Sequence, residues 1–96
     1  MLDKLTLEDF APRLAEIFRL EMPDGGSMDL RLVEAAGVGG TPNRRPPFSL
    51  VFEGAAEPIL AQAVYPLHHD DMGTLEIFLV PIGPGGASMR YESVFT

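Results

Sequence analysis

Hydrophobic and polar side chains alternate along most of the chain from residue 17 onward. The alternation is cleanest where Met28, Leu30 and Leu32 are separated by Asp29 and Arg31. A period of two places successive side chains on opposite faces of an extended chain, so it predicts half-buried β-strands. The segments that read as strands are residues 17–22, 28–35, 48–53, 63–69, 74–81 and 89–95.

Glycine, proline and aspartate gather between these segments, as is typical of turns. Residues 23–26 (Pro-Asp-Gly-Gly) separate the first two strands, which predicts an antiparallel hairpin. Residues 70–73 and 83–86 bracket the fifth strand, and Gly73 is expected to take a positive φ. The one long connection is 37–47, which holds three glycines and three prolines and is predicted to be the most mobile segment.

The N-terminal segment shows a helical spacing instead. Apolar residues recur at i, i+3, i+4 and i+7 from Leu7 to Leu14, which places them on one helix face. Thr6 is a suitable residue to cap the first turn. Pro12 would clash with the carbonyl one turn earlier in a continuous helix. We therefore expect a short helix over about 7–14 that bends near Pro12.

Six short strands with short connections predict a mostly β fold with a minor α contribution. The expected architecture is a small antiparallel six-stranded barrel or sandwich with one short N-terminal helix. That helix is expected to cover an open end or an exposed face. Ninety-six residues predict a single domain, residues 1–96, with one modest core.

Aromatic side chains are the strongest candidates for this core. The phenylalanines predicted to be buried are Phe18, Phe48, Phe52, Phe78 and Phe95. Segment 74–81 is apolar on both faces after Glu76, which predicts a central, buried strand. Segment 63–69 contains Pro66, which has no N–H to donate, so this strand is expected to be an edge strand or to be bulged.

Composition and charge exclude several functions. The chain contains no cysteine, which removes disulfides, thiolate catalysis and cysteine-based metal sites. The net charge of −7 argues against a phosphate backbone, so we expect no nucleic-acid partner. The sequence has no apolar run of about 18 residues and no basic start typical of a signal peptide. We therefore expect no membrane association and a cytoplasmic location.

The sequence contains one cluster of metal-binding residue types, His68-His69-Asp70-Asp71. Neighbouring strand residues point to opposite faces and a zinc site needs three or four ligands, so a hairpin turn is favoured. No metal and no cofactor are predicted. No serine stands in a Gly-x-Ser-x-Gly elbow, and the glutamates fall on outward strand faces. The sequence therefore predicts that the protein is not an enzyme.

Several segments together resemble a family of short bacterial proteins known only as a domain of unknown function. The family order is Leu-Thr-x-x-x-Phe, Phe-Ser-Leu-x-Phe-x-Gly, Tyr-x-Leu-x-His, Leu-Val-Pro-Ile-Gly and Tyr-Glu-x-Val-Phe, matched here at residues 5–10, 48–54, 65–69, 79–83 and 91–95. The resemblance implies no activity, because none is assigned to the family. It suggests a connector in a phage-tail-like assembly. Gly54 and Gly83 within these motifs look like turn positions.

Two functions are compatible with these observations. The first is a non-enzymatic protein-interaction or assembly module that binds a protein partner or itself, with strand edges available for pairing. The alternative is a small-molecule or metal-binding β-barrel. The candidate binding residues are the polar and amphipathic ones of the family motifs, Tyr65, His69, Tyr91 and Glu92.

Overall fold

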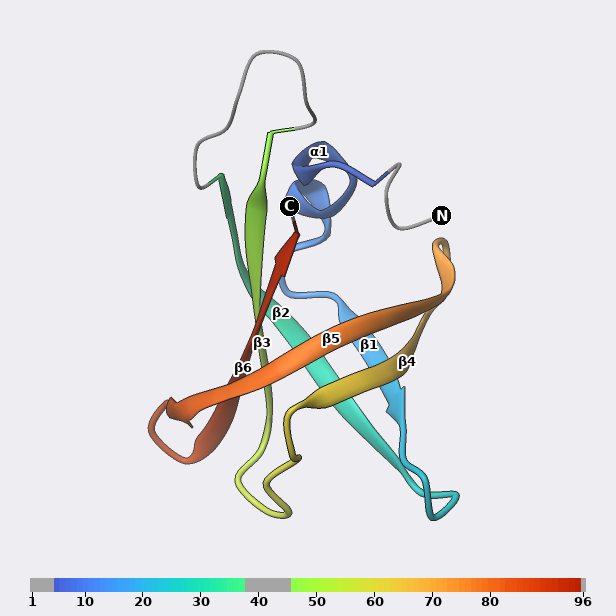
Figure 1. Ribbon diagram of the computed structural model, residues 1–96, viewed down its shortest axis with the longest axis vertical. Helices are drawn as coiled ribbons and strands as arrows, with labels where there is room; N and C mark the ends of the chain where they lie inside the picture. Colours follow the sequence, from blue (N-terminus) through green and yellow to red (C-terminus); the bar gives the residue numbers. More distant parts are fainter. Residues whose placement is uncertain (1–4, 38–45, 96) are drawn as a thin grey trace.

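The chain forms a closed barrel of six antiparallel strands with a short helix at one end (Figure 1). The computed structural model describes residues 5–37 and 46–95. Its elements are α1 (Leu7–Phe10), the 3-10 helix η2 (Ala11–Arg13), β1 (Ile17–Glu21), β2 (Ser27–Gly37), β3 (Phe48–Ala55), β4 (Ala63–His69), β5 (Gly73–Pro84) and β6 (Ser88–Phe95). A mostly β fold with one short N-terminal helix is therefore confirmed, and the barrel is the architecture formed.

The strands follow the order β1-β2-β3-β6-β5-β4 around the barrel, and β4 pairs with β1 to close it. The predicted hairpin of β1 and β2 is confirmed, with Phe18 opposite Leu30. The chain is not a simple meander, because it crosses from β3 to β4 and later brings β6 back beside β3. Closure gives each described strand a neighbour on both sides, although the β1–β4 ladder holds only two residue pairs and the β5–β6 ladder four.

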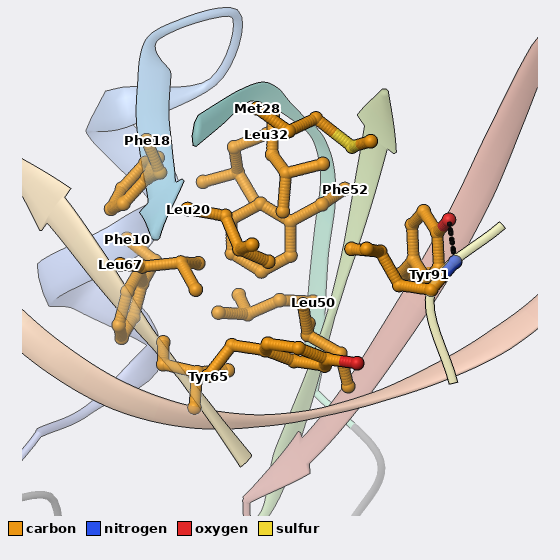
Figure 2. Packing of buried hydrophobic residues seen from close by; sticks show 14 of the residues in the cluster. Phe10, Phe18, Leu20, Met28, Leu32, Leu50, Phe52, Tyr65, Leu67 and Tyr91 are labelled. Atoms are coloured by element: carbon orange, nitrogen blue, oxygen red, sulfur yellow. Dashed lines mark hydrogen bonds between the residues drawn. The ribbon is translucent and has the colours of Figure 1, made fainter. Parts of the chain in front are cut away.

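The inner faces of the strands build one continuous hydrophobic core (Figure 2). Phe18, Phe48 and Phe52 are fully buried, and Phe95 is nearly so. The rings of Phe48 and Phe95 stack with their centroids 4.6 Å apart. Burying one such side chain contributes about 1.5–3 kcal/mol of transfer free energy. Four of the five aromatic residues predicted for the core are thus confirmed.

A sixth phenylalanine, Phe10 of α1, closes one end of the barrel. Its side chain is fully buried. Its ring centroid lies 6.4 Å from that of Phe18, 5.9 Å from that of Phe48 and 5.7 Å from that of Phe95. The helix lies over the end of the barrel where β6 finishes (Figure 1). The expected cover over an open end is therefore present.

The N-terminal helix ends where proline requires it to end. The N–H of Thr6 donates to the Asp9 carboxylate at 2.8 Å, which satisfies one unpaired donor of the first turn. After Phe10 the backbone tightens into η2, and Pro12 lies near the start of that 3-10 turn. The predicted bend is confirmed. Among residues 5–37 and 46–95, no helix has the length and apolar character that crossing a membrane requires.

The prediction that the fifth strand is buried on both faces is wrong. Ile77 and Leu79 are fully buried on the inner face of β5, but Phe78 between them is 44% exposed. Phe78, a predicted core residue, lies on the outer wall opposite Val64 of β4. A barrel has a single interior, so only alternate residues of a strand can enter it.

The strand that contains Pro66 is neither an edge strand nor bulged. β4 pairs with β5 without a register shift from Ala63 to His69, so the expectation for this strand was wrong. Its ladder with β1 is short, however, and ends at Leu67 opposite Leu20. Pro66 lies just beyond that last pair, where a missing N–H costs little. The register shifts occur in β2 and β5 instead.

The long connection between the second and third strands is only partly described. β2 extends to Gly37 and β3 begins at Phe48, so the first residue of the predicted loop is part of a strand. The rest of that prediction falls largely on residues 38–45, which lie outside the described residues. The expectation of mobility stays a prediction.

Glycine serves different purposes at three positions. Gly73 has a φ of 77°, so its predicted positive φ is confirmed. Gly83 has a φ of 117° at the register shift of β5. Gly54 was expected in a turn but lies within β3, and a Cβ there would come within 2.6 Å of the Leu30 side chain and 3.2 Å of Met28. Gly54 is therefore required by close packing rather than by a turn.

Replacing Gly54 with alanine should lower the free energy of unfolding by about 1–3 kcal/mol, because fully buried Leu30 has little room to move. Urea denaturation measures the change. Gly37→Ala is the matched control, since the nearest atom to its added Cβ is 3.9 Å away. The control should leave stability unchanged or slightly higher. Equal unfolding midpoints for the two variants would contradict this interpretation of Gly54.

Candidate functional site

The four candidate binding residues do not meet at one place. Tyr65 and Tyr91 point into the barrel toward the same connecting segment, whereas His69 lies at the opposite end of β4. Four residues along a strand correspond to about 13 Å. Glu92 follows Tyr91 on β6 and points outward. Their role in binding stays a prediction, but the structure divides them among three environments.

The two tyrosines hold the connection between β3 and β4 (Figure 2). The fully buried Tyr91 hydroxyl accepts the N–H of Leu60 at 2.9 Å. The Tyr65 hydroxyl donates to the carbonyl of Ala61 at 2.7 Å. The bond to Leu60 is buried, so the Tyr91 hydroxyl satisfies a backbone group that water does not reach, whereas the bond to Ala61 is only part-buried. Both phenol groups are therefore engaged within the fold.

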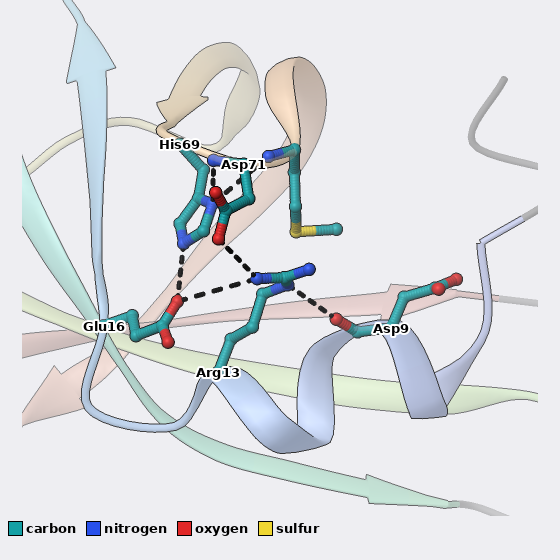
Figure 3. Close-up of polar contacts among 6 residues, drawn as sticks. Asp9, Arg13, Glu16, His69 and Asp71 are labelled. Atoms are coloured by element: carbon teal, nitrogen blue, oxygen red, sulfur yellow. Dashed lines mark hydrogen bonds and ion pairs between the residues drawn. The ribbon is translucent and has the colours of Figure 1, made fainter.

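His69 is buried, and both its ring nitrogens have partners (Figure 3). Nδ1 accepts the N–H of Asp71 at 3.1 Å and that of Met72 at 3.3 Å. Two donors at Nδ1 fix the proton on Nε2, which donates to the Glu16 carboxylate at 2.7 Å. The ring also packs on Phe18, with centroids 4.6 Å apart. Nδ1 and Nε2 are thus both occupied, which leaves this imidazole no nitrogen for a metal or for proton transfer.

The contacts of His69 belong to a small polar network that joins the N-terminal segment to the turn between β4 and β5. Arg13 donates to the carboxylate of Asp71 at 3.3 Å and to the backbone carbonyl of Asp9 at 3.1 Å. Glu16 lies between Arg13 and His69. Its carboxylate is 3.9 Å from the Arg13 guanidinium and 2.7 Å from Nε2 of His69 (Figure 3). The prediction that residues 70–73 form a turn is confirmed. The network fastens the helical cap to that turn.

No group of three or more histidine, cysteine, aspartate or glutamate side chains that could hold a metal ion occurs within residues 5–37 and 46–95. His68 points to the opposite face from His69, as the strand period requires, and its Nδ1 lies 2.6 Å from the Thr74 hydroxyl. The two candidate histidines therefore cannot serve one ion.

Two surface cavities contact the candidate residues, but neither unites them. One of about 500 Å³ opens between the β1–β2 turn and β4 and includes Tyr65. The other, of about 160 Å³, includes Arg19, His68 and His69. Neither is lined by Tyr91 or Glu92. A ligand that contacted all four candidate residues is not accommodated by these cavities.

The outer wall carries an exposed apolar feature, and it includes Phe78, which the sequence predicted to be in the core. We call it the outer strip and define it as Val64, Phe78, Val80 and Ile82. Val64 lies directly opposite Phe78, and β5 (orange in Figure 1) continues outward through Val80 to Ile82 at its register shift. Val64 is 56% exposed and Ile82 49%. The signal was present in the sequence, because a strand apolar on both faces in a small barrel must expose one of them.

Beside the strip, three outer-wall residues form a row of charges across β2, β3 and β6. Glu53 accepts from Arg31 at 3.0 Å and from Arg90 at 3.4 Å. The Ser88 hydroxyl and then these two guanidiniums hold the pKa of Glu53 below its ordinary value. Exposed pairs of this kind contribute modestly to stability. Arg31 and Arg90 both donate to Glu53, so neither is available as the counter-ion of another carboxylate.

Comparison with known proteins gives a family but no activity. A family model described as a domain of unknown function, DUF6916, matches residues 5–95. The match covers nearly the whole chain, so the chain belongs to that family. No curated protein and no solved structure matches the chain. Function therefore has to be argued from the geometry of the fold.

Replacing Tyr91 with phenylalanine should cost about 1–3 kcal/mol of stability, because the buried N–H of Leu60 loses its acceptor. Tyr65→Phe is the comparison, since Ala61 is exposed and water can replace the lost donor. Thermal unfolding of the two variants should rank Tyr91→Phe as the more destabilised. A Tyr91→Phe variant as stable as the wild type would show that the phenol is not structural.

The Glu53 row predicts a pH dependence. A carboxyl whose pKa is lowered on folding stabilises the protein above its unfolded pKa of about 4.3, and this contribution is lost as the pH falls through the folded pKa. Wild type should therefore be more stable than Glu53→Gln at pH 7, and the difference should vanish in acid. Urea midpoints between pH 7 and pH 2 measure it. Glu57→Gln, at an exposed loop position, should have the same urea midpoint as the wild type at every pH in this range.

Proposed function

We propose that this member of the DUF6916 family is a non-enzymatic protein-binding module that docks its partner on the outer strip. The observation that carries the proposal is the exposed cross-strand pair of Val64 and Phe78 on the barrel wall. Exposed aromatic and aliphatic side chains that form one patch are characteristic of protein interfaces, where a few such residues supply most of the binding free energy.

The filled interior supports an external site. The inward faces of β1 to β6 meet in one packed cluster that includes both candidate tyrosines. Small-molecule sites are usually concave and lined by apolar walls with a few available polar groups. In this barrel the tyrosine hydroxyls and the imidazole of His69 already bond to the protein itself.

The closed barrel also changes how the partner would be held. Strand addition needs a row of unpaired backbone groups, and closure leaves these only where a ladder stops short, as at the start of β4. Docking on the outer strip uses side chains instead, as face-to-face packing does. A connector in a phage-tail-like assembly, which the family resemblance suggests, is one form that such a module would take.

A small-molecule or metal-binding barrel remains the second hypothesis. The separation of Tyr65 and Tyr91 from His69 and Glu92 gives it no common pocket within the described residues. Elemental analysis of the purified protein together with a ligand thermal-shift screen distinguishes the two hypotheses. Stoichiometric metal, or a small molecule that raises the melting temperature, would favour the second.

The direct test places a photo-crosslinking amino acid at Val64, beside Phe78, in cells that naturally produce the protein. The proposal predicts one discrete crosslinked species, which Phe78→Ser should reduce at least about tenfold, the loss typical of a hot-spot aromatic residue. Phe78→Ser should still fold, since the side chain is half exposed. The same probe at Ile59, which is 61% exposed in the connection between β3 and β4 and is not part of the strip, is the matched control.

Either of two results would contradict the proposal. The Val64 probe could give the same crosslinked species as the Ile59 probe, or its discrete species could persist unchanged in Phe78→Ser. Both would mean that the outer strip is not the contact surface.

A further inference from the structure

We infer that the partner docked on the outer strip presents an apolar ridge flanked by lysine or arginine, and that it is a different protein rather than a second copy of this chain. The inference rests on the proposed function, because it names the chemistry of the partner at that same surface. It follows from the charges that border the strip.

Acidic side chains border the outer strip on two sides. Glu76 lies two residues before Phe78 on the outward face of β5 and is exposed. Glu92 of β6 lies directly opposite Val80. The same outer row continues across β3 to Glu34 of β2, since Glu92 pairs with Val51 and Val51 with Glu34. Glu76 and Glu92 thus border the apolar strip, and Glu34 lies two strands farther along the same row of the outer wall.

These three carboxylates lack counter-ions among the residues that the structure describes. No ion pair or side-chain hydrogen bond joins Glu34, Glu76 or Glu92 to any residue of 5–37 or 46–95. The nearby outer-wall arginines are committed elsewhere, because Arg31 and Arg90 both donate to Glu53. The border of the strip is therefore negative and available for pairing.

Charge complementarity selects the partner. A basic residue brought to Glu76 or Glu92 forms an ion pair at the rim of an interface, which speeds association and excludes like-charged competitors. Anionic membranes and nucleic acids would be repelled by the same carboxylates and by the net charge of −7. An apolar surface with an acidic border therefore fits a basic protein surface.

The same carboxylates oppose self-association through the strip. In a two-fold dimer the same patch meets itself, so Glu76 and Glu92 of one copy would approach those of the other. Like charges brought together at an interface cost free energy, and two copies would also add their net charges of −7. A second copy is thus the less favourable occupant.

The test uses two designed amphipathic helical peptides with the same leucine ridge, one flanked by lysines and the other by glutamates. Fluorescence anisotropy with the full chain measures their dissociation constants at low and moderate salt. The lysine peptide should bind at least about tenfold more tightly than the glutamate peptide, and its affinity should fall as salt rises. Phe78→Ser should weaken its binding as well.

Two matched pairs of variants distinguish the contribution of the border carboxylates to affinity from that of the net charge. Glu76→Gln with Glu92→Gln should weaken the lysine peptide about three- to tenfold at low salt. Glu8→Gln with Glu57→Gln removes the same charge at exposed positions outside the strip and its border and should change affinity less than about twofold. Equal losses in the two pairs would overturn the inference, because the attraction would then be non-specific.

The remaining outcomes distinguish this inference from the proposed function. Equal binding of both peptides, lost in Phe78→Ser, would overturn the basic partner but leave the outer strip as a docking surface. A wild-type dimer in sedimentation velocity that Phe78→Ser converts to monomer would identify a second copy as the occupant and overturn the inference. No binding by either peptide, or binding indifferent to Phe78→Ser, would count against both proposals.

Discussion

Closure of the six-stranded barrel is the constraint on which the rest of this structure depends. The pairing of β4 with β1 gives every strand one face toward a common interior and one face toward the outside. Phe10 then closes one end, so the interior becomes a packed core rather than an open channel. Because the interior is filled, the side chains that meet solvent lie on the outer wall and in the connections between strands.

The polar residues that look most like a site serve the closure itself. The phenols of Tyr65 and Tyr91 hold the connection that enters β4, and His69 fastens the turn that leaves it. Their hydrogen bonds reach backbone groups at both ends of one strand, of which the N–H of Leu60 is in a buried bond. In contrast, the exposed apolar side chains of β5 are not part of the buried core. Glu76 and Glu92 lie beside this exposed apolar surface, and both proposals for the function rest on that arrangement.

The sequence predicted the strands well because alternation is a local property, and residues 28–32 show it in every position. It also predicted the bend at Pro12 and the turn before Gly73, since both depend on the backbone limits of single residues. Strand order could not be predicted, and the choice between a barrel and a sandwich stayed open, because both depend on contacts between distant segments. The wrong prediction for Phe78 has the same origin. A strand with apolar residues on both faces is predicted to be buried on both, and only the closed barrel, with its single interior, shows that one face must be exposed. The hydrogen-bond partners of the tyrosines could not be predicted either. They are backbone groups, such as the N–H of Leu60, which the residue type does not identify.

The most direct test of this account measures which side chains of β5 meet solvent. The chain contains no cysteine, so single substitutions at positions 77, 78 and 79 each report on one site through their rate of thiol labelling in native buffer. The account predicts that Phe78→Cys reacts like an exposed thiol, while Ile77→Cys and Leu79→Cys react roughly tenfold or more slowly, at a rate set by unfolding. Equal protection of all three positions would mean that β5 is covered on both faces, which would contradict both the single interior and the outer strip.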